Sequence, residues 1–393
     1  MIKELEKCCG CGACSDICPK KCITMEKSID GFLYPCVNAV DCVECGLCDT
    51  VCPQQNCKEK LISSHGYIAF SKNPQQRENG SSGGIFGMAA AYVIDKGGAV
   101  FGAGFDDKLK LRQYCVNEKN ELKRLYKSKY LQCDTGDFYR NVKELLESGR
   151  YVLVCNTPCN ISALKNYLKK DYNNLLTIDF VCHGVPSQDF FDQCMEWYNT
   201  DRGMKILEYK FRKKTASAAT PHLFEIKYEK NNKLYIKTDL YLKDPFYNAF
   251  QKRLSVRQSC YDCNYAMPQR ISDITIGDFH DIDKVKKGYD RMMGVSMILV
   301  NSSKGMDMLD NIKELLDICE TDIETLTANN ECLKSPTSRP KNREEFFEHL
   351  KNKGVEYLAD NELNYRKDWK ALVYYKMPKR LRAILKKIIL GGI

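Results

Sequence analysis

Two nearly identical runs of cysteines stand near the start of the chain, CCGCGACSDICP at residues 8–19 and CVECGLCDTVCP at residues 42–53. Both contain the spacing Cys-x2-Cys-x2-Cys-x3-Cys-Pro, and corresponding cysteines lie 34 positions apart. Three thiolates on one tight loop can bind three corners of a 4Fe–4S cube, while the fourth cysteine of such a run reaches a second cube. The spacing therefore predicts two 4Fe–4S clusters that exchange their fourth ligands.

The ligand sets follow from this exchange. The first cluster is expected to take the three leading cysteines of the first run and the last of the second: Cys8, Cys11, Cys14 and Cys52. The second cluster takes the complementary set: Cys18, Cys42, Cys45 and Cys48. Cys8 rather than Cys9 opens the first run, because only Cys8 leaves two residues before Cys11. Zinc and disulfides are the alternatives, but zinc sites usually combine two separate Cys-x2-Cys pairs.

Four further cysteines come from three separate segments of the chain. Cys159 and Cys182 each follow a predicted strand, and Cys260 and Cys263 form a Cys-x2-Cys pair. Together these four could bind a third 4Fe–4S cluster. A zinc site, or buried cysteines without any ligand, are the alternatives. If this set is wrong, Cys133 and Cys155 are the expected substitutes.

A glycine- and serine-rich turn, NGSSGG at residues 79–84, opens a predicted helix over residues 84–95. The free N–H groups and the dipole at a helix N-terminus favour a phosphate, and glycines allow the backbone to approach it. The alternative is a capped helix with a flexible entry. His183, directly after Cys182, is a candidate proton donor beside a reduced cofactor, although a single histidine at a strand end more often packs locally.

Strands must position these residues. From about residue 66 the sequence alternates apolar strand-like and helix-like segments, which predicts an α/β layer with a substantially parallel sheet. In such sheets ligands gather beyond the carboxyl ends of the strands. We expect an α+β protein with three parts: a two-cluster ferredoxin domain at 1–60, an α/β domain at 66–300, and a C-terminal region at 301–393.

Composition narrows the class of protein. The chain has 393 residues, 22 of them cysteines, and a formal charge of +9. Clustered cysteines in a chain of this size favour metal binding in a reducing compartment over disulfides. No secretory signal and no long apolar run are evident, so a cytoplasmic protein is expected. A general nucleic-acid surface is not indicated, because residues 366–393 alone hold nine Lys or Arg and one acidic residue.

The basic C-terminal tail has its own pattern. Pro378 can start a helix whose apolar side chains recur at helical spacing: Leu381, Ile384, Leu385, Ile388 and Ile389. Basic residues occupy the other positions, and Gly391 ends the helix. The helix could pack on the body with a solvated basic face. It could also lie on an anionic membrane, which would place the protein at the inner face, or bind an acidic partner such as ferredoxin.

Five segments resemble the beta subunit of coenzyme F-420 hydrogenase and dehydrogenase with a fused ferredoxin domain. They are SSGGIF (81–86), SKYLQ (128–132), NTPCN (156–160), DFVCHGVPS (179–187) and CYDCNYAMPQRISDITIGDF (260–279). The resemblance implies a flavoprotein that passes electrons between iron–sulfur clusters, a bound FAD (or, less expected, FMN) and an acceptor, which in the family is the deazaflavin coenzyme F-420. The chain departs from the family pattern at Asn156, Asn160, Lys127 and His280.

The resemblance also implies that the domain at 66–300 binds flavin and a cluster, and it implies roles for particular residues. The third cluster would be bound by Cys159, Cys182, Cys260 and Cys263. The flavin phosphate would lie at the glycine-rich turn, with these residues around the cofactor: Asn79, Ser81, Ser82, Gly83, Gly84 and Lys129. We therefore expect an iron–sulfur flavoprotein oxidoreductase that exchanges electrons with ferredoxin or another redox protein and acts on a small-molecule acceptor. The alternatives are an electron-relay subunit without a substrate of its own and an iron–sulfur sensor.

Overall fold

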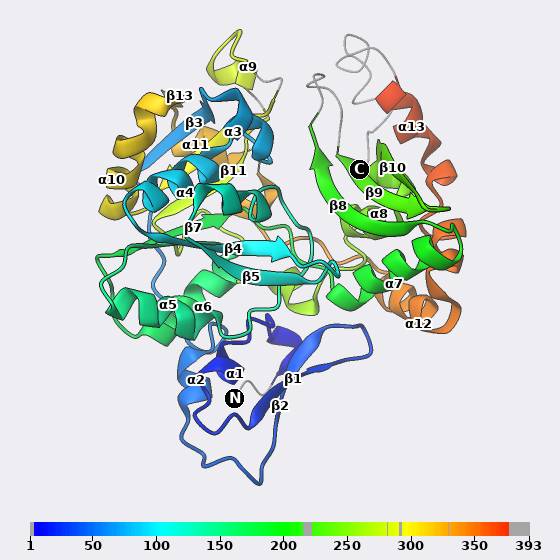
Figure 1. The fold of residues 1–393 in the computed structure, drawn as a ribbon, viewed down its shortest axis with the longest axis horizontal. Helices are drawn as coiled ribbons and strands as arrows, with labels where there is room; N and C mark the ends of the chain where they lie inside the picture. The colour runs from blue at the N-terminus through cyan, green and yellow to red at the C-terminus, as the bar shows by residue number, and fades with distance from the viewer. Residues whose placement is uncertain (1–3, 215–221, 281, 291–292, 329, 377–393) are drawn as a thin grey trace. The chain divides into compact units, whose positions relative to one another are not determined.

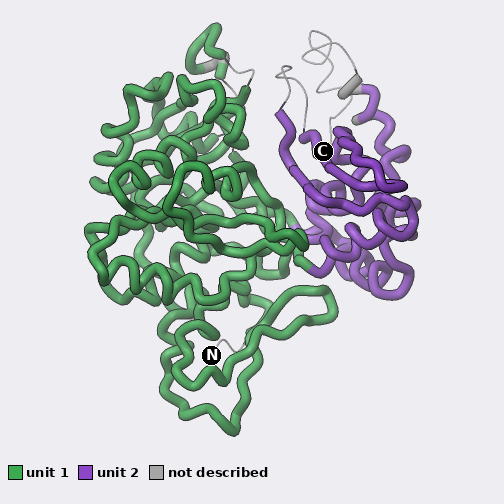
Figure 2. The backbone as a smooth tube through the Cα atoms, viewed as in Figure 1, with its two compact units in different colours: residues 1–188, 256–338 green, residues 189–255, 339–393 purple. Residues whose placement is uncertain are grey.

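A computed structural model describes residues 4–214, 222–280, 282–290, 293–328 and 330–376 (Figure 1). The chain separates into two compact units, one of residues 1–188 and 256–338 and the other of residues 189–255 and 339–393 (Figure 2). The first unit holds both cysteine runs and a large sheet. The three-part division by function predicted from the sequence follows different boundaries and stays a prediction.

The large sheet has eight strands in the order β13-β3-β12-β11-β7-β6-β4-β5. Its centre is parallel and consists of β11 (Ile274–Asp278), β7 (Leu175–Phe180), β6 (Val152–Asn156) and β4 (Ala99–Phe105). The outer strands pair antiparallel and are β12 (Ser296–Val300), β3 (His65–Ser71), β13 (Leu316–Glu320) and β5 (Leu111–Val116). The predicted parallel sheet is therefore a mixed sheet with a parallel centre. Two successive antiparallel pairings separate β3 from β11, so β3 runs in the direction of the central strands.

Helices cover both faces of this sheet. On one face α4 (Ile85–Asp95) and α10 (Ser303–Ile312) pack against Val100 and Leu153. On the other face α5 (Phe138–Glu147) and α6 (Pro158–Leu168) pack against the alternate strand positions, such as Phe101 and Val152. This alternation is the period of two that a strand buried on both faces requires. The observed α4 agrees with the helix predicted over residues 84–95.

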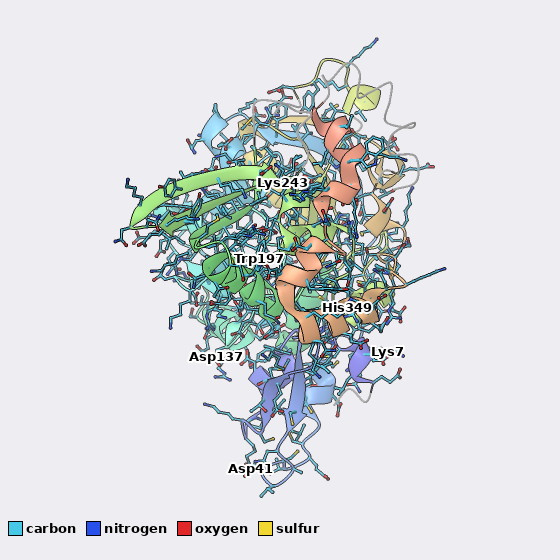
Figure 3. The ribbon with its side chains drawn as sticks, turned by 90° about the vertical axis from the view of Figure 1, so that its right-hand side faces the viewer. Lys7, Asp41, Asp137, Trp197, Lys243 and His349 are labelled. Atoms are coloured by element: carbon cyan, nitrogen blue, oxygen red, sulfur yellow. The ribbon has the colours of Figure 1, made fainter. Side chains whose placement is uncertain are left out.

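The N-terminal cysteine segment packs on the α5 and α6 layer. Its two short helices, α1 (Ala13–Ile17) and α2 (Leu47–Val51), place Ala13 and Val51, both with no exposed surface, in the same core as Phe138 and Ile161. A hairpin of β1 (Ile23–Lys27) and β2 (Leu33–Val37) joins the two runs, as its Asp30-Gly31 turn predicts. Asp41, beside the second run, lies at the far end of this segment from the sheet (Figure 3).

The second unit is built on a three-stranded antiparallel sheet of β8 (Lys205–Lys213), β9 (Leu223–Lys230) and β10 (Lys233–Leu240). Its helices are α7 (Gln188–Thr200), α8 (Pro245–Gln251), α12 (Arg343–Asp360) and α13 (Trp369–Lys376). Aromatic side chains fill its core: Phe191 lies 5.0 Å from Phe246 between ring centroids, and Phe190 lies 5.5 Å from Phe346. Residues far apart in the sequence therefore share one core.

The predicted basic helix after Pro378 lies outside the described residues. Among the helices that the structure describes, none has the length and apolar character needed to cross a membrane.

Candidate functional site

The two cysteine runs adopt the same local conformation. Each short helix follows a glycine in the left-handed region, Gly12 with φ +74° and Gly46 with φ +70°. Each helix ends at the cysteine before the proline, and Cys18 and Cys52 have nearly the same backbone angles. An added Cβ at Gly12 would lie 2.4 Å from Thr135 Oγ1, so the close approach of the body also requires glycine there. The repeat in the sequence is thus a repeat in the structure.

The two predicted ligand sets line two neighbouring cavities. Cys8, Cys11, Cys14 and Cys52 all line the first, and Cys18, Cys42, Cys45 and Cys48 all line the second, although Cys48 also borders the first. The last cysteine of each run, Cys18 or Cys52, thus lines the cavity that holds the leading cysteines of the other run, and the thiols present fit two 4Fe–4S clusters. The role of these residues as iron ligands stays a prediction.

The Cys14 thiol in the first cavity is a poor thiolate without a metal. Burial raises the pKa of Cys14 to about 12. Iron would stabilise the thiolate form, since metal binding displaces the thiol proton. Across the described residues, no group of three or more His, Cys, Asp or Glu side chains is arranged to hold a single metal ion. Thiolates at the corners of a four-iron cube lie farther apart than the ligands of one ion.

The third cysteine group also comes together. Cys159 lies in the first turn of α6, directly after β6, and Cys182 directly follows the neighbouring parallel strand β7. The pair Cys260 and Cys263 lies at η4 (Gln258–Asp262), and electrostatic interactions link Cys182 to both of them and to Cys159. All four side chains are largely withdrawn from solvent, and burial raises the pKa of Cys260 to about 12. The α6 N-terminus at Cys159 adds a dipole that favours a negatively charged group.

Cys9 connects the first and third groups, a position that sequence reasoning missed. Its thiol hydrogen-bonds to Cys11 of the first group and to Cys159 of the third. The two-residue gap assigned Cys8 to the first cluster and left Cys9 without a role, although the Cys8-Cys9 doublet was visible in the sequence. By contrast, Cys133 and Cys155, the predicted substitutes, lie beside Lys129.

His183 contacts a cysteine from a distant segment. Its Nδ1 lies 3.2 Å from Sγ of the buried Cys332, and Cys332 in turn interacts electrostatically with Cys182. His183 is therefore next to the third group, as a proton donor to a neighbouring cofactor would have to be. Its catalytic role stays a prediction.

The glycine-rich turn is held by neighbouring segments. Ser81 Oγ accepts hydrogen bonds from Ser128 N at 2.6 Å and Ser128 Oγ at 2.9 Å, and Ser82 Oγ donates to Val295 O at 2.8 Å. Asn79 ends α3 (Pro74–Asn79), where its Oδ1 accepts from Gln75 Nε2 at 3.1 Å. The structure thus brings together the turn and the SKY segment that the resemblance assigned to one cofactor site.

Packing accounts for the two glycines at the end of this turn. A Cβ at Gly83 would lie 2.3 Å from the backbone oxygen of Ala69, and Gly83 N–H already donates to Ser296 Oγ at 2.9 Å. Gly84, the residue before α4, has φ +88°. Both positions need glycine whether or not a phosphate binds. A flavin site here must therefore use other N–H groups of the turn and of α4.

Lys129 is a half-buried lysine whose side chain holds a loop in place. Its ammonium donates to three backbone oxygens: Ala103 O at 2.9 Å, Arg124 O at 3.1 Å and Tyr126 O at 2.7 Å. Burial lowers the pKa of Lys129 to about 7, with Cys133 and Cys155 opposing that shift. These contacts hold the residues before SKY against β4.

Replacing Lys129 with Met should abolish a pH-dependent part of the stability. The pKa of Lys129 is about 7 in the folded protein and about 10.5 when unperturbed, so between these values the unfolded chain binds the additional proton. The free energy of unfolding from this group therefore rises as pH increases above about 7. In urea unfolding at pH 6 and 8.5, the wild type should gain stability relative to Lys129→Met at the higher pH. A difference between the two proteins that does not change with pH would contradict this assignment.

The fold and the cysteine groups define an iron–sulfur protein with a two-cluster segment attached to an α/β body. Residues 7–56 match the model of a 4Fe–4S dicluster domain. Residues 149–325 match the family model for the C terminus of the coenzyme F-420 hydrogenase/dehydrogenase beta subunit. These two matches confirm the resemblance found in the sequence: residues 149–325 are similar to this beta-subunit family, and residues 7–56 to a two-cluster 4Fe–4S domain.

Among solved structures, the chain is similar to one from the xenon-derivatised F-420-reducing NiFe hydrogenase complex of Methanosarcina barkeri. The two chains are 13% identical, the match covers 77% of this chain and 92% of the other, and the TM-score is 0.44. A comparison with curated proteins found no significant match.

Proposed function

We propose that the protein is an iron–sulfur flavoprotein oxidoreductase that passes electrons between 4Fe–4S clusters, a bound flavin and an organic acceptor similar to coenzyme F-420. The observation that carries the proposal is the arrangement of twelve cysteines in three groups of four. Two groups share residues 8–52, and Cys9 contacts the first group and the third. Clusters bound there would give electrons a continuous route from the N-terminal segment to the ends of the sheet strands.

Different residues of the chain would have different roles in this electron transfer. The twelve cysteines would hold iron–sulfur clusters, which supply one-electron transfer, and a flavin would couple single electrons to hydride transfer. The turn at residues 79–84 and Lys129 would position the flavin. His183 would hold a proton near the third group. Neighbouring side chains restrict the access of water to that group, since Cys159, Cys182 and Cys260 are all half-buried.

Two observations support a flavin at the glycine-rich turn. The turn follows β3 and α3 and opens α4, an 11-residue helix whose dipole favours a phosphate. Because β3 runs in the direction of β6 and β7, the turn lies at the same edge of the sheet as Cys159 and Cys182. Ligands of α/β sheets gather at this edge.

A relay subunit without a substrate of its own is the second candidate. It is favoured by the bond between Gly83 N–H and Ser296 Oγ, which occupies one of the donors expected to hold a phosphate. The matched family is also named for beta subunits, which work within larger assemblies. In both cases we propose ferredoxin or another redox protein as the electron partner. Contact of the basic tail with an anionic membrane is a further proposal.

Flavin content and turnover separate these candidates. Protein purified without oxygen should release FAD on denaturation. When supplied with reduced ferredoxin, it should reduce a deazaflavin of the coenzyme F-420 type, followed by loss of deazaflavin absorbance. Bound flavin with no turnover until a partner subunit is added would favour the relay subunit. Clusters without any flavin would contradict both forms of the proposal and leave an iron–sulfur sensor.

A further inference from the structure

The side chain of Arg257 is completely buried between the N-terminal segment and the body. Its Nε donates to Cys8 O at 2.6 Å and its Nη2 donates to Leu33 O at 2.9 Å, both in the N-terminal segment. Its Nη1 donates to Gln132 Oε1 at 2.9 Å in the body. Arg257 thus binds a residue of the first cysteine group, and it stands three positions before Cys260 of the third group.

All three of these partners are neutral. Other buried arginines of this unit instead bind carboxylates: Arg270 binds Asp179 at 3.0 Å and Arg77 binds Asp290 at 2.6 Å. The rings of Phe32 and Tyr34, with centroids 5.3 and 4.2 Å from the guanidinium carbon, compensate only part of the charge. A buried cation is unfavourable unless an anion balances it. The buried guanidinium of Arg257 therefore requires a nearby negative charge, which its three neutral hydrogen-bond partners do not provide.

We propose that Arg257 is the counter-charge of the clusters in the first and third groups and raises their reduction potentials. The proposal rests on the proposed function, because it requires those clusters. A 4Fe–4S cluster with four thiolates is anionic and gains a further negative charge on reduction. A fixed guanidinium nearby stabilises the reduced form more than the oxidised form. The cysteine groups in turn balance the buried charge.

The surroundings of Arg257 are shaped to keep it in place. An added Cβ at Gly10 would lie 2.6 Å from Arg257 Nη1 and 2.1 Å from Gln132 Nε2. Gly10 has φ +66°, which glycine adopts readily. Gln132 Nε2 also donates to Cys9 O at 3.1 Å and Gly10 O at 2.8 Å. The guanidinium is thus fixed beside the loop that carries Cys8, Cys9 and Cys11.

Redox titration of the clusters by electron paramagnetic resonance tests this role. In Arg257→Gln, the ratio of reduced to oxidised first and third cluster at a fixed potential should fall by about tenfold, which corresponds to about 59 mV for a one-electron couple. Arg257→Lys keeps the charge and should change the ratio much less. The second cluster, whose cavity is lined by none of the residues that contact Arg257, should shift least and serves as an internal reference.

Arg140 provides the matched control. It also joins the body to the N-terminal segment, through Asp16 at 2.9 Å, but its charge is already neutralised by that carboxylate. Arg140→Gln combined with Asp16→Asn removes both charges of this pair and should leave all potentials unchanged. Wild-type potentials in a cluster-loaded Arg257→Gln would overturn the proposal. If Arg257→Gln does not retain iron, the variants Arg257→Lys and Gln132→Leu test the proposal instead. The proposal requires the cluster potentials of both variants to stay near those of the wild type. Equal downward shifts of the potentials in both variants would overturn it. Absence of clusters from the wild type would instead refute the proposed function.

Discussion

Replacing Cys260 and Cys263 with serine is expected to lower the iron content of anaerobically purified protein by about four atoms per chain, from about twelve to about eight. These cysteines provide half of the third group, and the remaining Cys159 and Cys182 cannot hold a cube alone. The signals of the two N-terminal clusters should persist, because their cysteines line separate cavities. Iron and sulfide analysis with electron paramagnetic resonance measures both effects.

Cys319→Ser is a suitable control, because Cys319 lies on β13 and belongs to none of the three groups. It should leave iron unchanged. The variant Cys9→Ser distinguishes two roles of Cys9. An unchanged iron content with slower electron transfer between the clusters would indicate that Cys9 is a contact between them. A loss of iron would indicate that Cys9 is a ligand. An unchanged iron content in the Cys260 and Cys263 double variant would remove the third cluster from the proposed function.

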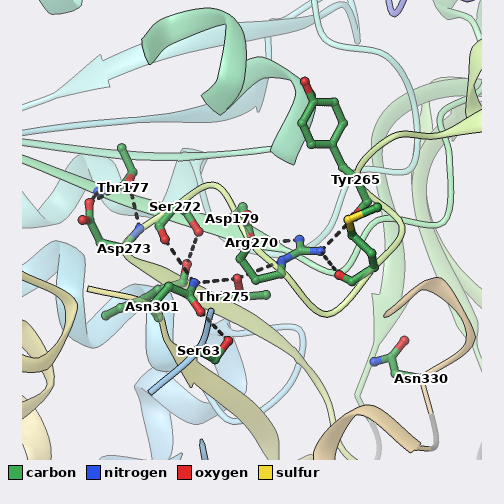
Figure 4. A network of polar contacts seen from close by, with 12 residues as sticks. Ser63, Thr177, Asp179, Tyr265, Arg270, Ser272, Asp273, Thr275, Asn301 and Asn330 are labelled. Atoms are coloured by element: carbon green, nitrogen blue, oxygen red, sulfur yellow. Dashed lines mark hydrogen bonds and ion pairs between the residues drawn. The ribbon is translucent and has the colours of Figure 1, made fainter. Parts of the chain in front are cut away.

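Replacing Arg270 with Met is expected to lower the free energy of unfolding by about 3–5 kcal/mol. The guanidinium binds Asp179 Oδ1 at 3.0 Å, and both side chains are almost fully buried (Figure 4). It also donates to Tyr265 O, Met267 O and Thr275 Oγ1. Met would leave the Asp179 carboxylate buried without its cation and would release the loop that follows Cys263.

Arg112→Met is the control for this variant. Arg112 also binds carboxylates, Asp106 at 3.1 Å and Asp134 at 3.0 Å, but half of its side chain is exposed. Water screens such pairs, so the change should cost about 0–1 kcal/mol. Urea unfolding followed by circular dichroism compares the two variants. Similar losses in both would show that burial of the Arg270 pair adds nothing to its effect.

The tertiary structure decided the features that depend on long-range pairing and packing. The antiparallel outer strands β12, β3, β13 and β5 turn a parallel sheet into a mixed one, and the direction of such a strand depends on partners distant in the sequence. The second unit combines residues 189–255 with residues 339–393, and no local pattern marks such a pairing. The positions of Cys9 between two groups and of Arg257 among neutral partners likewise exist only once the N-terminal segment packs on the body. The position of Lys129 among backbone oxygens depends on packing within the body.

The sequence by itself determined what local spacing controls. Cluster ligands on a tight loop must be a few residues apart, so the two-cluster domain and the family resemblance could be predicted from the residues, while the exchange of fourth cysteines stays a prediction. The helix over residues 84–95 and the hairpin at Asp30-Gly31 also follow from local backbone preferences. The sequence also shows glycines at positions 83 and 84, but it does not show why glycine is needed there. Gly83 lies in close contact with Ala69, and Gly84 has a left-handed backbone conformation. Such contacts arise only when distant segments pack together.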